Sequence, residues 1–308
     1  MKSNILTTFL IVLSSFGNSQ SLPHVCSGSI QRIENFPSRF VAPRNVDIWL
    51  PDGYDTSKKY SVVYMHDGQM LFDSTQTWNK KEWGVDEIFG KLIKYGKIRQ
   101  CIVVGIWNVA EDRFADYFPQ KVIPNIAVNI RTRILKEQLK QEPKADNYLK
   151  FIVQELKPTI DKTYSTSTEA QNTYLIGSSM GGLISLYALC EYPDVFGGAA
   201  CMSTHTPLAA PDLINPKTDE QVASKLRDYL EKKLPEANTK KIYFDYGSLT
   251  LDAYYKPYQA KIDTILKNKG YDSIHWQTRE FQGADHSETS WNKRLEIPLL
   301  FLLSTKSE

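Results

Sequence analysis

Residues 174–183, which read YLIGSSMGGL, decide the fold of this chain. The segment begins as an apolar run that predicts a buried strand and ends in a run that predicts a helix. Between them, residues 177–181 match the pattern G-x-S-x-G around Ser179. Glycine on both sides removes the side chains that would collide in a sharp strand-to-helix turn. We therefore expect Ser179 at the apex of that turn, with its hydroxyl above the sheet. Ser178 is the weaker candidate, because neither residue two positions from it is glycine.

Short apolar runs alternate with helix-like stretches along most of the chain. Runs of this kind suit strands that are buried on both faces of a parallel sheet. The predicted strands cover residues 60–65, 101–107, 173–176, 198–202, 242–246 and 273–281, after two antiparallel strands at 29–35 and 45–50. The predicted helices cover residues 85–95, 147–161, 182–191, 218–233, 252–267 and 287–303. The alternation predicts one α/β domain over residues 20–308, with a mostly parallel central sheet and helices on both faces.

One long segment fits no strand–helix unit. Residues 120–143 lie between a predicted strand and the next helix, and we expect them to form a small inserted cap. The basic run at 131–136 could attract an anionic substrate. The solvated face of an amphipathic helix is the favoured interpretation.

Composition and charge limit the classes of partner. The chain has 308 residues and a formal net charge of +2, which gives no reason to expect a nucleic-acid partner. Its four cysteines, Cys26, Cys101, Cys190 and Cys201, show no zinc-binding spacing, so no metal site is expected. We interpret them as small buried side chains, and a disulfide is left unassigned.

The first 19 residues have the features of a secretory signal peptide. A basic start is followed by a short apolar stretch and by small residues before a polar site. The apolar stretch is too short to cross a bilayer. We therefore predict an exported protein, periplasmic or secreted, without a membrane anchor.

A serine at such a turn needs a histidine base, which in this architecture comes last in the chain, after an acid. Three histidines follow Ser179. His205 comes before the strand whose loop should carry the acid, and His275 alternates within a predicted strand. His286 lies in a polar loop just after the last strand, at the edge of the sheet expected for Ser179. His286 is therefore the predicted general base.

The loop after the strand at 242–246 is the expected place of the acid. Asp252 is the first carboxylate beyond that strand, although it could also simply cap the following helix. Asp245 is the second choice, but it lies within the strand. Asp285 is too close to His286 in sequence to orient it in the usual way.

Backbone amides must stabilise the negative charge that forms on the substrate. The Met180 amide, at the start of the helix, is one candidate. The Gln69 amide is the other, in a loop where Gly68 lets the backbone turn inward. His66 and Asp67 precede the serine in the chain, so we expect them to brace this loop.

With these motifs the chain resembles the esterase family of α/β-hydrolases. That family includes the esterase D type, feruloyl and acetyl-sugar esterases, siderophore esterases and mycolyltransferases. The matching residues are 46–54 (VDIWLPDGY), 64–69 (YMHDGQ), 177–182, Arg113, Tyr117, His286-Ser287-Glu288 and Trp291. The resemblance spans about residues 44–303 and implies the α/β-hydrolase fold.

The resemblance implies hydrolysis of a carboxylic ester through an acyl-enzyme, without a metal or an organic cofactor. Suitable substrates would be extracellular esters of sugars or aromatic acids, or a siderophore ester. Trp78 and Trp83 could stack on such a substrate, although packing in the core or a lid explains them equally well. Two alternatives remain: transfer of the acyl group to an acceptor other than water, and a binding protein built on a hydrolase fold.

Overall fold

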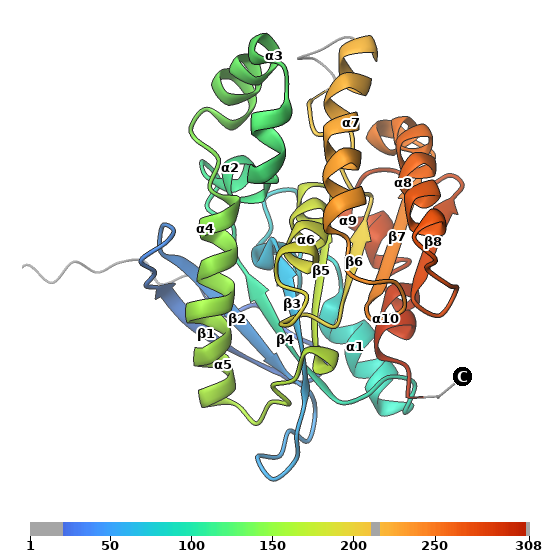
Figure 1. Cartoon of the computed structure of the whole chain (residues 1–308). Coiled ribbons are helices and arrows are strands. Elements are labelled where there is room, and N and C mark those ends of the chain that lie inside the picture. The colour runs from blue at the N-terminus through green and yellow to red at the C-terminus, as the bar shows by residue number, and fades with distance from the viewer. Residues whose placement is uncertain (1–20, 211–215, 306–308) are drawn as a thin grey trace, which may run out of the picture.

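The computed structural model describes residues 21–210 and 216–305, which form one eight-stranded sheet covered by helices (Figure 1). The strands are β1 (Ser29–Phe36), β2 (Arg44–Leu50), β3 (Ser61–His66), β4 (Cys101–Ile106), β5 (Thr173–Ser178), β6 (Gly198–Met202), β7 (Lys241–Gly247) and β8 (Trp276–Phe281). Their order across the sheet is β1-β2-β4-β3-β5-β6-β7-β8. Strand β2 runs antiparallel to both its neighbours, and all the pairs from β4 to β8 are parallel. The predicted α/β-hydrolase fold with a mostly parallel sheet is confirmed.

Helices cover both faces of the sheet. The longer ones are α1 (Val85–Lys94), α4 (Ala145–Lys150), α5 (Lys157–Thr163), α6 (Met180–Glu191), α7 (Pro216–Lys233), α8 (Lys256–Asn268) and α10 (Glu296–Leu303). Helices α1 and α10 pack on one face, and α4 to α8 pack on the other. Short elements complete the chain: α2 (Arg113–Tyr117), α3 (Val128–Arg133), α9 (Glu288–Asn292), the 3-10 turns η1 (Gly68–Met70), η2 (Gln120–Asn125), η5 (Ala170–Asn172) and η6 (Thr250–Tyr254), and the π segments η3 (Ile134–Leu139) and η4 (Phe151–Leu156).

Strand β3 shows why the apolar runs form this sheet. All six of its residues are buried. Val62 and Tyr64 belong to the core on the α4–α8 side, whereas Val63 and Met65 belong to the core on the α1 and α10 side. Successive side chains of a strand point to opposite faces, so a strand between two helical layers must be apolar throughout.

The segment predicted as an insertion, residues 120–143, is largely helical. It contains η2, α3 and η3, and α3 lies at the top of the molecule in Figure 1. The buried Gln138 joins the segment to the loop after β6. Its Nε2 donates to the Leu208 carbonyl at 2.9 Å, and its Oε1 accepts from the Ala210 amide at 3.2 Å. The exposed residues of the basic run include Arg133 and Lys136, while Ile134 is buried, as expected for an amphipathic helix.

Several helix boundaries differ from the expectation, and two of them lie near the candidate site. Helix α6 begins at Met180, directly after the turn and two residues before the predicted start at Gly182, so it also includes Gly181. The predicted final helix is broken into α9 and α10, with Arg294 in the connection.

The predicted signal peptide lies outside the described residues. Among the described residues, none of the helices has both the length and the apolar character needed to cross a bilayer. The interpretation of the cysteines as buried side chains is wrong for Cys26, which is exposed. Cys101, Cys190 and Cys201 are buried, and no disulfide joins these four cysteines in the described part of the chain.

Candidate active site

Ser179 occupies a strained position between β5 and α6. Its backbone has φ 56° and ψ −121°, a conformation that residues other than glycine rarely adopt. A Cβ atom on Gly177 would lie 2.5 Å from the carbonyl carbon and oxygen of Gly181. The Ser179 amide donates to the Met202 carbonyl at 2.9 Å, which ties the turn to β6. The sharp turn expected from the sequence is therefore present, and glycine at 177 is what permits it.

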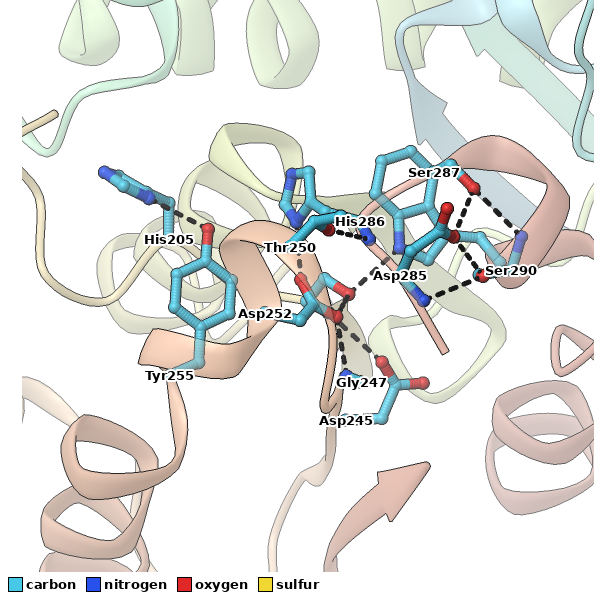
Figure 2. A network of polar contacts seen from close by, with 12 residues as sticks. His205, Asp245, Gly247, Thr250, Asp252, Tyr255, Asp285, His286, Ser287 and Ser290 are labelled. Atoms are coloured by element: carbon cyan, nitrogen blue, oxygen red, sulfur yellow. Dashed lines mark hydrogen bonds and ion pairs between the residues drawn. The ribbon is translucent and has the colours of Figure 1, made fainter. Parts of the chain in front are cut away.

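His286 and Asp252 meet directly, although 34 residues separate them in the chain. The distance from His286 Nδ1 to Asp252 Oδ1 is 2.5 Å (Figure 2). Asp252 lies in η6, and Thr250 of the same turn accepts a hydrogen bond from the His286 amide at 2.9 Å. This second bond orients the histidine loop. With Nδ1 bound to a carboxylate, Nε2 is the ring atom that remains for proton transfer.

Asp252 is fully buried and bound on all sides. Its Oδ2 accepts hydrogen bonds from Ser203 Oγ at 2.5 Å and from the Gly247 amide at 2.6 Å. Burial alone would raise the pKa of Asp252, but the bonds from His286, Ser203 and Gly247 outweigh burial and lower it. The carboxyl group is therefore ionised at neutral pH. An ionised carboxylate here fixes the histidine ring and stabilises its protonated form.

Ser179 and His286 face the same cavity, which has a volume of about 520 Å³. Its wall also contains Gln69, Asn108 and Arg113. The His286 ring packs edge-to-face on Trp291, with 5.1 Å between ring centroids, and on Tyr255 at 5.8 Å. The predicted serine and histidine therefore lie together on one side of the molecule.

Tyr255 and His205 form a buried pair beside Ser179. His205 Nε2 lies 3.2 Å from the Ala209 carbonyl, which can only accept, so Nε2 carries the proton. Burial, followed by the nearby His286, lowers the pKa of His205 to about 4, so the ring is neutral. Its Nδ1, 2.9 Å from the Tyr255 hydroxyl, must then accept the tyrosine proton. The Tyr255 oxygen is left as an acceptor. Burial raises the pKa of Tyr255, and a hydrogen bond with the Ser179 side chain partly offsets this rise.

The two amides proposed for the oxyanion lie in suitable backbone positions. Met180 is the first residue of α6, so its N–H has no acceptor within the helix. Gln69 lies in η1 and lines the cavity. A Cβ on Gly68 would come within 2.6 Å of the carbonyl of Gly105, so only glycine lets this loop pack against the end of β4.

Asp67 and His66 hold the loop that carries Gln69. Asp67 binds Arg113 with two hydrogen bonds of 2.8 and 2.7 Å and Asn108 with one of 2.7 Å. Burial would raise the pKa of Asp67, but Arg113 and Asn108 outweigh burial and lower it. His66 Nδ1 lies 2.8 Å from the Tyr148 hydroxyl, and burial lowers the pKa of His66 to about 4.

The two tryptophans singled out from the sequence are differently placed. Trp78 is 83% exposed and lines the cavity of Ser179. It also lines a second cavity of about 570 Å³ on the other side of the Gln69 loop, which Arg32 and Trp107 border. Trp83 is buried and stacks on Trp291, with 5.4 Å between ring centroids. Trp78 is therefore free to contact a ligand, whereas Trp83 supports the wall.

Sequence reasoning missed several residues that hold the site. Ser203, Tyr255 and Arg294 reach it from distant loops. Arg294 makes a buried ion pair with Asp245 at 2.9 Å and donates to Ser203 Oγ at 2.7 Å. Asp245, the second choice for the acid, is thus the ion-pair partner of Arg294. His275 has its own partner, since its Nδ1 lies 2.7 Å from Asp272 Oδ1.

The fold and the arrangement of this site define an α/β-hydrolase of the esterase type. The chain belongs to the family described as "Putative esterase", whose sequence profile matches residues 38–301.

Individual relatives are distant. The "Uncharacterized protein YbbA" of Bacillus subtilis (strain 168) is 26% identical over 161 residues, which cover 52% of this chain and 56% of YbbA. The chain thus spans little more than half the length of that relative.

Two solved structures have the same fold. The enterobactin esterase FES from Shigella flexneri, in the presence of 2,3-di-hydroxy-N-benzoyl-glycine, has a TM-score of 0.65 and 16% identity, covering 91% of this chain and 60% of its own. The ferulic acid esterase AmCE1/Fae1A from Anaeromyces mucronatus, in complex with ferulic acid, has a TM-score of 0.57 and 21% identity, covering 90% and 92%.

Proposed function

We propose that this chain is a serine esterase that hydrolyses carboxylic esters through an acyl-enzyme. One observation carries the proposal: a serine on a strained turn shares a cavity with a histidine whose other ring nitrogen is bound to a buried, ionised carboxylate. Membership of the esterase family supports it. No step of this reaction requires a metal or an organic cofactor.

In the proposed reaction, His286 Nε2 takes the proton from Ser179 as Oγ attacks the acyl carbon. Asp252 stabilises the imidazolium that forms. The amides of Gln69 and Met180 donate to the developing oxyanion. His286 then protonates the leaving alcohol, and the acyl group stays on Ser179. Water, activated by the same histidine, releases the acid and restores the serine.

We propose an ester of an aromatic acid as the substrate class, with sugar-linked acyl esters and siderophore esters as the alternatives. The exposed indole of Trp78 at the cavity offers a flat apolar face on which an aromatic ring can stack. Asn108 and Arg113 offer polar groups at the same wall. The two solved esterases above were studied with aromatic acids, which supports this choice. We further propose that the enzyme acts outside the cytoplasm, on the basis of the N-terminal sequence.

Turnover of p-nitrophenyl acetate tests the chemistry. Wild type should release nitrophenol and react with a fluorophosphonate probe, and Ser179→Ala should lose both activities. Ser178→Ala is the matched control, because Ser178 is the buried neighbour and should retain both. A folded wild type with neither turnover nor labelling would favour a binding protein.

A panel of esters tests the substrate class and the fate of the acyl group. Feruloyl, acetyl-sugar and siderophore esters are compared by kcat/KM, and the feruloyl ester should be preferred. Trp78→Ala should lower that preference with little effect on p-nitrophenyl acetate. Product analysis with an added sugar acceptor distinguishes hydrolysis from acyl transfer, since only a transferase would form the acylated sugar in excess of the free acid.

A further inference from the structure

A cluster of potential metal ligands lies apart from the cavity of Ser179. It consists of Cys26, Asp86 and Glu87, whose Sγ and carboxylate oxygens lie within 4.8 Å of one another. Asp86 and Glu87 belong to the first turn of α1, and Cys26 belongs to the segment that precedes β1. Cys26 and Glu87 are exposed, so an ion could enter from solvent.

Asp86 has an unsatisfied oxygen within this cluster. The residue is fully buried, and its Oδ2 accepts a hydrogen bond from the Cys26 amide at 2.6 Å. Its Oδ1 is buried and has no hydrogen-bond partner among the described residues. A buried carboxylate oxygen without a donor or a cation is costly, so the oxygen indicates a missing partner.

The carboxylates of this cluster lack a positively charged partner. No lysine or arginine forms a salt bridge with Asp86 or Glu87 in the described part of the chain. A bound cation would supply the partner that these oxygens lack.

We propose that Cys26, Asp86 and Glu87 form a binding site for a divalent transition-metal ion of the zinc class. A sulfur ligand favours zinc over magnesium or calcium, which prefer oxygen ligands alone. Ligands of tetrahedral zinc stand about 3.3–3.8 Å apart. The exposed side chains of Cys26 and Glu87 therefore need to close by at most about 1.5 Å, and water completes the coordination. Binding replaces the thiol proton, which is released to solvent.

The ion would fasten the segment before β1 to α1. Ser21 and Pro23 of that segment line the second cavity beside the Gln69 loop. The segment is also held by hydrogen bonds, such as the one from the His24 amide to Asp73 at 2.9 Å, and by Val25, which packs against the core on the α1 side. The site would thus be structural, and it does not depend on the proposed esterase activity.

Metal binding to the purified full chain tests the proposal. After treatment with a chelator, Zn²⁺ should bind with a single equivalent per chain by calorimetry and raise Tm, whereas Mg²⁺ and Ca²⁺ should not. Co²⁺ in place of Zn²⁺ should give a thiolate-to-metal absorption band. Zn²⁺ should also protect Cys26 from alkylation, because Cys26 is the exposed cysteine among the described residues.

Three variants locate the site. Cys26→Ser, Asp86→Asn and Glu87→Gln should each weaken Zn²⁺ binding at least ten-fold, and Cys26→Ser should abolish the cobalt band. Cys26 and Glu87 are exposed, so their variants should fold even if Asp86→Asn does not. Asp52→Asn is the matched control, since Asp52 accepts bonds from Ser27 and Gly28 of the same segment but lies outside the cluster.

Two results would overturn the proposal. One is the absence of Zn²⁺ binding in wild type. The other is Zn²⁺ binding that survives unchanged in Cys26→Ser and Glu87→Gln, which would place the ion elsewhere on the chain.

Discussion

The Asp252 carboxylate determines which nitrogen of His286 carries a proton. If Asp252 is the catalytic acid, Asp252→Asn presents an amide to Nδ1 and favours the wrong tautomer, while the space remains filled. We expect kcat/KM for p-nitrophenyl acetate to fall by about 10⁴-fold. Circular dichroism should show that the variant is folded. Activity within ten-fold of wild type would remove Asp252 from the mechanism.

The Tyr255 oxygen is left as an acceptor beside Ser179, so we expect it to compete with His286 for the Ser179 proton in the free enzyme. Tyr255→Phe should therefore speed fluorophosphonate labelling of Ser179, by about five-fold for a hydrogen bond of ~1 kcal/mol. The same variant should lower Tm, since His205 Nδ1 loses its donor. Slower labelling would mean that Tyr255 assists the reaction instead.

At the scale of elements, the turn between β5 and α6 depends on the absence of a side chain at one position. In Gly177→Ala the new Cβ would meet the Gly181 carbonyl at 2.5 Å, so the turn must shift. We expect the free energy of unfolding to fall by about 3 kcal/mol or more, with loss of esterase activity. Gly96→Ala is the control: its φ is +63° and nothing lies within 4 Å, so only about 1 kcal/mol of backbone strain is expected.

Strand β3 ends in a buried histidine whose pKa is depressed. Between pH 6.5 and about 4, His66 takes up a proton in the unfolded chain but not in the folded one. Its contribution to stability is therefore complete above pH 6.5 and is lost as the pH falls toward 4. Between pH 6.5 and 4, the free energy of unfolding should change by about 3 kcal/mol less in His66→Gln than in wild type.

The pH dependence of stability must be compared between His66→Gln and wild type, because other buried groups change the stability with pH in the opposite direction. Burial raises the pKa of Asp116 to about 6, which weakens folding as the pH rises. Urea titrations of both proteins at several pH values provide the measurement. Parallel pH profiles would show that His66 is protonated equally in both states.

The sequence predicted the elements well where burial determines them. Each predicted strand is present, and the inner strands β2 to β7 were recognisable because a strand buried on both faces must be apolar. The start of α6 was predicted two residues too late, since glycine at 181 is a poor helix former that the turn nevertheless requires. The break before α10 was missed, although Pro298 in its first turn indicates a helix start.

At the scale of the whole molecule, the sheet order brings the candidate residues together. Ser179 follows β5, Asp252 follows β7 and His286 follows β8, and these parallel strands end at the same edge. Chain order and sheet geometry were therefore sufficient to place these three residues. The supporting contacts were not predictable: Arg294 and Ser203 meet across 91 residues, and only packing of distant loops sets such a contact.

The exposure of Trp78 gives this protein a spectroscopic reporter at the mouth of its cavity. Of the six tryptophans, Trp49, Trp83 and Trp291 are buried, and Trp78 is by far the most exposed of those described. Its indole should emit at long wavelength, as in water. An aromatic acid stacked on it should shift that emission to shorter wavelength or quench it. Trp78→Phe should abolish the change, and the titration then yields Kd directly, without any turnover.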